Sequence, residues 1–158
     1  MDLDTALQMC ENLLQPLAES MEHPEPNRLD VKLSPNRLPE AVKLIIDNQW
    51  GYLTAITGLD HPVAAAEGAE PDGILEALYH FCNGSAVTTL RVSVPYANPV
   101  IPTICEIIPV ATLFERELME LFGITCEGTP TTDHLILPEN WPDEVYPLRK
   151  SFTGMNQS

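Results

Sequence analysis

The sequence predicts a single α+β domain: a mostly antiparallel sheet of about four strands with helices packed on one side, plus an extended, irregular C-terminal tail. Three observations predict it. Apolar residues recur at helical spacing in some segments, other segments alternate or are β-branched, and periodicity stops after Ile124. A chain of 158 residues can bury a core of its own. We expect an N-terminal helix and linker over 1–28, a core over 29–124 and a partner-docking tail over 125–158.

The first third of the chain is predicted as helix, strand and helix. Asp4 can cap a first helix that ends near Ser20, and a polar, proline-containing linker follows over 22–28. Strict alternation over 29–33 predicts a half-buried strand. Pro39 suits the first position of a second helix over 40–48. The stripe of the first helix consists of Leu3, Leu7, Cys10, Leu13, Leu14 and Leu17.

The middle of the chain predicts three strands. Residues 50–57 are aromatic and β-branched, and the small, acidic stretch 58–72 is expected to be a loop. Residues 74–82 and 87–94 flank Asn83-Gly84-Ser85, and Asn-Gly is a strong hairpin signal. Two sets of apolar residues each share one strand face: Leu75, Ala77, Tyr79 and Phe81; Leu90, Val92 and Val94.

The clearest helical pattern covers 112–122. Thr112 and Glu115 fit a capping box, and Gly123 sits where a helix-ending glycine belongs. Before it, residues 98–109 contain three prolines, so we expect at most a short turn over 102–108. The apolar stripe consists of Phe114, Leu118, Leu121 and Phe122.

The tail after Ile124 has no period but is too apolar for a solvated segment. It holds four prolines before Arg149, an apolar run at 135–137 and spaced aromatic residues. We expect an extended segment that lies on a surface, either that of its own domain or that of a partner.

The charge balance excludes several partners. Lys plus Arg is 8 and Asp plus Glu is 23, so the formal net charge is −15. Such a chain repels nucleic-acid phosphates, and it lacks the basic clusters that bind anionic lipid. The acidity could instead steer a basic partner. No secretory signal or apolar run of membrane-spanning length occurs, so we expect a cytoplasmic chain that meets membranes only through partners.

No catalytic or metal-binding motif is found. The four cysteines form no CxxC, the four histidines have no ligand spacing, and nucleotide-binding glycine motifs are absent. His80 is expected to be a satisfied sheet histidine, Asp133–His134 a surface pair, and Arg116–Glu120 an ordinary helical ion pair. An acid–base enzyme using Glu115, Glu117 or His134 remains a remote alternative.

Four blocks carry a family resemblance. FEREL…LFGI at 114–124, EG at 127–128, LPENW at 137–141 and YPLRK at 146–150 occur in this order. With weaker likeness upstream, residues 29–152 resemble the respiratory complex I 30-kDa subunit, which is the C subunit of bacterial NADH–quinone oxidoreductase. The family includes homologues in energy-converting membrane-bound [NiFe] hydrogenases.

The resemblance implies a non-catalytic scaffold subunit on the cytoplasmic side of the cell membrane, peripheral to it, within a larger complex. Members bind no cofactor. Their partners are the large subunit, which carries the quinone site or the NiFe centre, and a small iron–sulfur subunit. Iron–sulfur clusters, and in some complexes FMN, belong to those partners. Thr129–His134 departs from the family's basic pattern, and with the short C-terminus this favours the hydrogenase branch over the quinone branch.

The resemblance also places the partner-binding residues, since the tail of family members lies along the large subunit. A third reading stays open beside it, in which the chain is an autonomous binding module with its tail folded on its own domain. The expected partner-binding residues are Glu115, Arg116, Glu117, Phe122, Pro138, Trp141, Tyr146, Pro147, Leu148, Arg149 and Lys150.

Overall fold

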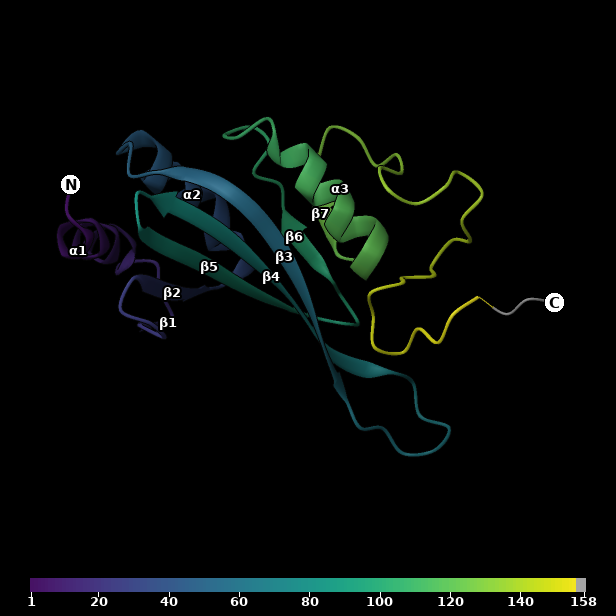
Figure 1. Ribbon diagram of the computed structural model, residues 1–158. Coiled ribbons are helices and arrows are strands. Elements are labelled where there is room, and N and C mark those ends of the chain that lie inside the picture. Colours follow the sequence, from purple (N-terminus) through teal and green to yellow (C-terminus); the bar gives the residue numbers. More distant parts are fainter. Residues whose placement is uncertain (156–158) are drawn as a thin grey trace.

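The computed structural model describes residues 1–155 and forms one α+β domain with three α-helices (Figure 1). Its elements, in chain order, are α1 Leu3–Leu14, β1 Ser20–Glu22, β2 Arg28–Leu33, a 3₁₀ turn Pro35–Arg37, α2 Leu38–Asp47, β3 Tyr52–Val63, β4 Asp72–Asn83, β5 Ala86–Pro95, β6 Val100–Pro102, α3 Ala111–Phe122 and β7 Thr125–Glu127. No helix within residues 1–155 is long and apolar enough to cross a bilayer.

The main sheet has five strands in the order β1-β2-β5-β4-β3. All neighbours are antiparallel except β2 and β5, which run parallel with Arg28 opposite Val87 and Leu33 opposite Val92. A second, two-stranded sheet pairs β6 with β7 in parallel. The predicted α+β class is confirmed, but the prediction missed β1 and the second sheet.

One face of the main sheet carries the core. Alternate residues of β2, β4 and β5 are fully buried there, as strand periodicity requires. Thr88 of β5 donates to the Cys10 sulfur of α1, and Gly58 of β3 lies directly under the Phe122 ring of α3. The helices therefore cover this face, and α2 lies behind the strands in Figure 1. The opposite face carries polar side chains such as Arg91.

The predicted hairpin is confirmed and is longer than expected. β4 and β5 pair in register from Ile74–Pro95 to Asn83–Ala86, around the Gly84-Ser85 turn. β3 also continues to Val63, so the expected loop over 58–72 shrinks to 64–71. Alternation fails in this part of β3 because its last residues project beyond the helices and are exposed on both faces.

The first helix differs from its prediction at both ends. Asp2, not Asp4, is the cap, because its carboxylate accepts from the Thr5 amide at 3.0 Å. The helix ends at Leu14, before Pro16, instead of near Ser20. Residues 20–22, expected at the end of the helix and the start of a linker, form the short edge strand β1. A proline two residues after the last helical residue stops a helix because it lacks an amide donor.

The capping box predicted for α3 is wrong. Val110 occupies the cap position without a side-chain bond, and the Thr112 hydroxyl is buried with no hydrogen-bond partner in the described chain. Glu115 turns instead to the segment after β6. The predicted C-terminal glycine is confirmed, since Gly123 is left-handed with φ 74° and its amide bonds Met119.

One smaller prediction concerns a sheet histidine, and the structure also shows the state of the thiols. His80 is satisfied as expected: its Nε2 lies 3.0 Å from the Thr57 hydroxyl and its Nδ1 lies 3.1 Å from the Thr89 hydroxyl. All four cysteines are free, and only Cys82 is not buried. Burial raises the pKa of the Cys10 thiol to about 12, which makes it a poor nucleophile at neutral pH.

The Tyr79 hydroxyl yields a stability prediction. Tyr79 is fully buried, its hydroxyl has no hydrogen-bond partner among residues 1–155, and burial holds its pKa well above the usual value. A stranded buried hydroxyl destabilises the fold, so Tyr79→Phe should leave the free energy of unfolding unchanged or raise it by up to about 1 kcal/mol. Urea unfolding measures this, with exposed Tyr52→Phe as the matched control. A loss of more than about 1 kcal/mol would mean that a buried water satisfies the hydroxyl.

Candidate partner-docking surface

The tail after β7 lies on the chain's own domain, beside α3. It runs from Gly128 to Met155 without a regular element and passes along the side of α3 that faces away from α1 (Figure 1). Two sets of contacts attach it, one near His134 and one near Arg149.

Arg116 and Glu120 of α3 hold the first part of the tail. The Arg116 guanidinium donates to the backbone oxygens of Asp133 and His134 at 2.8 and 2.9 Å. The Glu120 carboxylate accepts from the Leu135 amide at 2.9 Å and from the Ile136 amide at 2.7 Å. His134 Nδ1 lies 3.1 Å from the same carboxylate. The predicted pairs Arg116–Glu120 and Asp133–His134 are therefore wrong. The two α3 side chains each bond to the tail and not to each other, and the His134 ring bonds Glu120 and not Asp133.

The Glu120 contacts depend on pH. Burial alone would raise the pKa of Glu120, but the bonds from Leu135, Ile136 and His134 overcome it and hold the pKa below the ordinary 4.5. A lowered folded pKa means that this stabilisation is full above pH 4.5 and is lost as the pH falls through the folded pKa. The Leu135 and Ile136 amide shifts in NMR spectra should therefore step together below pH 4.5.

A matched variant isolates this titration. Glu120→Gln keeps an accepting oxygen but removes the acid, so the step in the two amide shifts should disappear. A step that persists in Glu120→Gln, or one centred above pH 4.5, would contradict the assignment.

The second attachment joins the YPLRK block to three other segments. We call Asp60, Tyr96, Tyr146 and Arg149 the clasp. The Arg149 guanidinium lies over the Tyr96 and Tyr146 rings, 4.9 and 4.8 Å from their centroids, and its Nε donates to the Phe122 oxygen at 2.6 Å. Asp60 accepts from the Tyr96 hydroxyl and, at 2.8 Å, from the Lys150 amide.

Gly123 makes room for the clasp. Its left-handed φ of 74° turns the chain at the end of α3, and a Cβ atom there would lie 2.5 Å from a Tyr146 ring carbon. Glycine is required at this position both for the backbone conformation and for the close approach of the ring.

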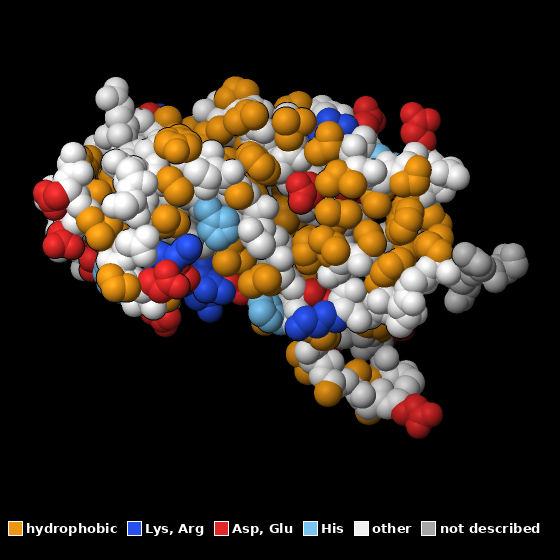
Figure 2. All heavy atoms as spheres, in the orientation of Figure 1, with side chains coloured by type: hydrophobic (Ala, Val, Ile, Leu, Met, Phe, Trp, Pro, Cys, Tyr) orange, Lys and Arg blue, Asp and Glu red, His pale blue; other side chains and the backbone are white. Residues whose placement is uncertain are grey.

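At both attachments the tail leaves apolar side chains exposed. Leu135 is 41% exposed, Ile136 58% and Leu148 51%. Orange side chains gather over the α3 side of the molecule in Figure 2. Trp141 is half-buried: its indole donates to the Val145 oxygen at 2.8 Å, and its ring lies 6.2 Å from that of Phe152. Exposed apolar groups on an ordered segment are typical of a contact surface.

The predicted partner-binding residues occupy three environments. Glu115 is fully buried and bonded within the chain, so it has no surface for a partner and that prediction is corrected. Pro138, Leu148 and Lys150 are exposed. The remaining predicted residues are half-buried: Arg116, Glu117, Phe122, Trp141, Tyr146, Pro147 and Arg149.

Several residues of this surface were not predicted. Glu120, Asp60 and Tyr96 are anchors contributed by separate elements, and no local pattern connects them. Leu135 and Ile136 could have been singled out, because the apolar run at 135–137 was the signal. The enzyme alternative gains nothing, since Glu115 and His134 lie in separate hydrogen-bond networks.

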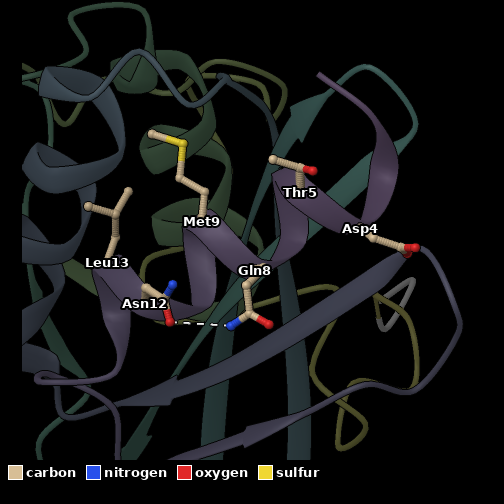
Figure 3. Close-up of a pocket in the computed structure, with 6 residues that line it drawn as sticks. All are labelled: Asp4, Thr5, Gln8, Met9, Asn12 and Leu13. Atoms are coloured by element: carbon tan, nitrogen blue, oxygen red, sulfur yellow. Dashed lines mark hydrogen bonds between the residues drawn. The ribbon is translucent and has the colours of Figure 1, made fainter.

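Two hollows away from the tail have linings that indicate no catalytic or binding site. One follows the outer face of α1 alone and is lined by uncharged side chains and Asp4 (Figure 3). The other, on the open sheet face, surrounds Arg91, whose guanidinium is already paired with Glu76 and Asp30. Within residues 1–155 no group of three His, Cys, Asp or Glu side chains is placed to hold a metal ion.

Fold and surface together define an α+β domain that carries an irregular tail along its last helix. Residues 31–158 match the family described as the respiratory-chain NADH dehydrogenase, 30 Kd subunit. The chain therefore belongs to this family, which includes hydrogenase homologues. The resemblance seen in the sequence is confirmed.

Relatives come from both branches of the family. The C subunit of the NADH-quinone oxidoreductase of Roseiflexus castenholzii is 33% identical over 77% of this chain and 68% of that protein. Membrane-bound hydrogenase subunit beta of Pyrococcus furiosus is 30% identical over 75% of this chain and 82% of that protein. Formate hydrogenlyase subunit 5 of Escherichia coli is 32% identical over 83% of this chain, which spans only 22% of that longer protein.

Solved structures share the fold. A chain of the membrane-bound sulfane sulfur reductase, an archaeal respiratory membrane complex, aligns with a TM-score of 0.72 at 19% identity. The alignment covers 94% of this chain and 85% of the reductase chain. The trypsin-resistant fragment of Nqo5 aligns with a TM-score of 0.59 at 25% identity, over 83% of this chain and 99% of the fragment.

Proposed function

We propose that this chain is a scaffold subunit of a complex-I-like, ion-translocating electron-transfer complex and that it docks through its tail onto the large subunit. The observation that carries the proposal is the tail itself, which is ordered on α3 yet leaves Leu135, Ile136 and Leu148 exposed. Family membership supplies the kind of assembly. Iron–sulfur clusters, with a NiFe centre or FMN, would belong to the partner subunits.

Within this family we favour the energy-converting membrane-bound [NiFe] hydrogenase branch, with the C subunit of NADH:quinone oxidoreductase as the alternative. The support is the segment Thr129–His134, in which Asp133 and His134 stand where the family commonly has a basic pair. That segment is anchored on α3 through Arg116 and Glu120, beside the exposed Leu135 and Ile136. A change in this segment would alter the surface that this chain offers to its partner. Two CxxC pairs in the copurified large subunit would support the hydrogenase branch, since they would be nickel–iron ligands.

Truncation after Glu127 tests the docking role. The buried core ends at Cys126, so the truncated chain should keep a cooperative thermal transition and its far-UV circular dichroism. Affinity purification from native membranes should recover the large subunit and iron–sulfur proteins with the full chain and not with the truncated one.

Two results would contradict this proposal. A full-length chain that leaves native membranes as a monomer would exclude the scaffold role. A truncated chain that unfolds would instead support an autonomous module whose tail completes its own domain.

A further inference from the structure

Tyr146 and Arg149 belong to the block that most resembles the family, yet their side chains bond inside the chain. Resting on the proposed docking function, we infer that they are positioning residues. Together with the other two clasp residues, Asp60 and Tyr96, they hold residues 129–145 in a preformed shape. We call residues 129–145 the docking loop, and its shape fits an apolar protein surface rimmed by basic side chains.

The contacts of Arg149 are already made within its own chain. Its guanidinium lies over two tyrosine rings, and its Nε reaches the Phe122 carbonyl that α3 leaves free at its C-terminus. The arginine guanidinium combines a planar cation that stacks on rings with donors fixed in the same plane, whereas the lysine ammonium is a compact point charge on a flexible stem. A residue that only paired with a partner carboxylate would not require this geometry.

Asp60 fixes the other side of the clasp. It is 5% exposed and accepts from two segments, the Tyr96 hydroxyl after β5 and the Lys150 amide of the tail. The Leu148 amide adds a bond of 3.1 Å to the Leu121 oxygen at the end of α3. The clasp therefore joins β3, the turn after β5, the end of α3 and the tail.

The docking loop is held at its start and middle as well. The Thr129 amide bonds the Cys126 oxygen at 3.2 Å, directly after β7, and Arg116 and Glu120 hold the segment at 133–136. A loop fixed at both ends and in the middle loses little conformational freedom on binding. Preorganisation of this kind increases affinity without adding contacts.

The exposed chemistry of the loop selects its partner. Leu135, Ile136 and Pro138 are exposed apolar residues close together in the sequence of the loop, and we call them the ridge. The same loop carries four exposed carboxylates, which we call the rim: Asp133, Glu139, Asp143 and Glu144. Glu144 is held at a φ of 60°, a conformation that non-glycine residues rarely adopt. This rim repels anionic lipid, and it repels the same face of a second copy. It is complementary to a protein surface that surrounds an apolar hollow with Lys and Arg.

Amide exchange of the isolated full-length chain tests the clasp without any partner. In Arg149→Lys, the Leu148 and Lys150 amides should exchange at least tenfold faster, because stacking and the Nε bond are lost while the charge remains. Lys150→Ala is the matched control: its side chain is exposed and only its amide is used, so exchange should not change. Unchanged exchange in Arg149→Lys would overturn the clasp.

Copurification from native membranes tests the ridge and its rim. In Ile136→Asp, the amount of large subunit recovered should fall at least tenfold, while the exchange rates of the Leu148 and Lys150 amides should not change. Asp143→Asn with Glu144→Gln should reduce the loss of assembly caused by raising the salt concentration. Assembly that is insensitive to both changes would overturn the proposed contact surface.

Two further measurements examine the excluded occupants. The isolated chain should stay monomeric by light scattering and should not sediment with phosphatidylglycerol vesicles; dimerisation or sedimentation that Ile136→Asp abolishes would overturn the assigned partner chemistry. Failure of the full chain to assemble at all would refute the docking function. Assembly together with unchanged exchange in Arg149→Lys would refute the clasp alone.

Discussion

Replacing Glu115 with alanine should lower the free energy of unfolding by about 3 kcal/mol or more, because several buried donors lose one acceptor at once. The Glu115 side chain is 0% exposed and accepts from the Thr103 hydroxyl at 2.7 Å and the Ile104 amide at 2.8 Å. The Cys105 thiol lies 3.1 Å from the same carboxylate. These bonds tie the segment after β6 to α3, and the alanine would also leave a cavity.

Urea unfolding followed by circular dichroism measures this loss. Glu117→Ala is the matched control, because that glutamate lies on the same helix, is half-buried and makes no hydrogen bond or ion pair in the described structure; its effect should stay within about 0.5 kcal/mol. Glu115→Gln keeps one accepting oxygen and should fall between the two. Similar stabilities for Glu115→Ala and Glu117→Ala would mean that the buried network contributes little.

Gly123→Ala should destabilise the chain and open the clasp. An L-residue at a φ of 74° costs about 1–2 kcal/mol. In addition, the new methyl group would lie 2.5 Å from a Tyr146 ring carbon, so the ring must move away from its place beside Arg149. We expect a total loss above the backbone cost alone, together with faster exchange of the Leu148 amide.

A double-mutant cycle separates the two causes. In a Tyr146→Ala background the ring is absent, so Gly123→Ala should cost only the backbone term of about 1–2 kcal/mol. Equal losses in both backgrounds, measured by urea unfolding, would show that Tyr146 does not press on this position.

Local patterns predicted the elements whose structure is decided locally. The β4–β5 hairpin follows from alternation around Asn83-Gly84, and α3 follows from its apolar stripe and Gly123. α2 begins at Leu38, with Pro39 in its first turn, within two residues of the prediction. In each case the period, the turn residue and the terminating residue indicate the same structure.

The missed elements are too short to show a period of their own. β1, β6 and β7 are each three residues long; β1 pairs with β2 across residues 23–27, and β6 pairs with β7 across α3. The capping-box prediction was wrong because Glu115 accepts hydrogen bonds from outside the helix. Its donors are the Thr103 hydroxyl and the Ile104 amide, which precede α3 in the chain.

The contacts of the tail within its own chain could not be predicted from the sequence. The blocks at 137–141 and 146–150 directed attention to the tail, and the family resemblance assigned Arg149 to a partner. Its actual acceptors, the Phe122 oxygen and two tyrosine rings, lie on three segments. Composition also indicated that the tail was too apolar for solvent without showing that α3 provides part of its surface.

The parallel pairing of β2 with β5 has a consequence for synthesis on the ribosome. β2 leaves the ribosome well before β5, because α2, β3 and β4 lie between them in the chain and are synthesised first. Until then only one edge of β2 can pair, with the three-residue strand β1, and the apolar side chains of Leu29, Val31 and Leu33 lack the neighbouring strand β5, whereas β4 and β5 can pair as soon as both are out. The nascent N-terminal third therefore spends this interval with one edge of β2 unpaired and apolar side chains uncovered, the state that chaperones recognise.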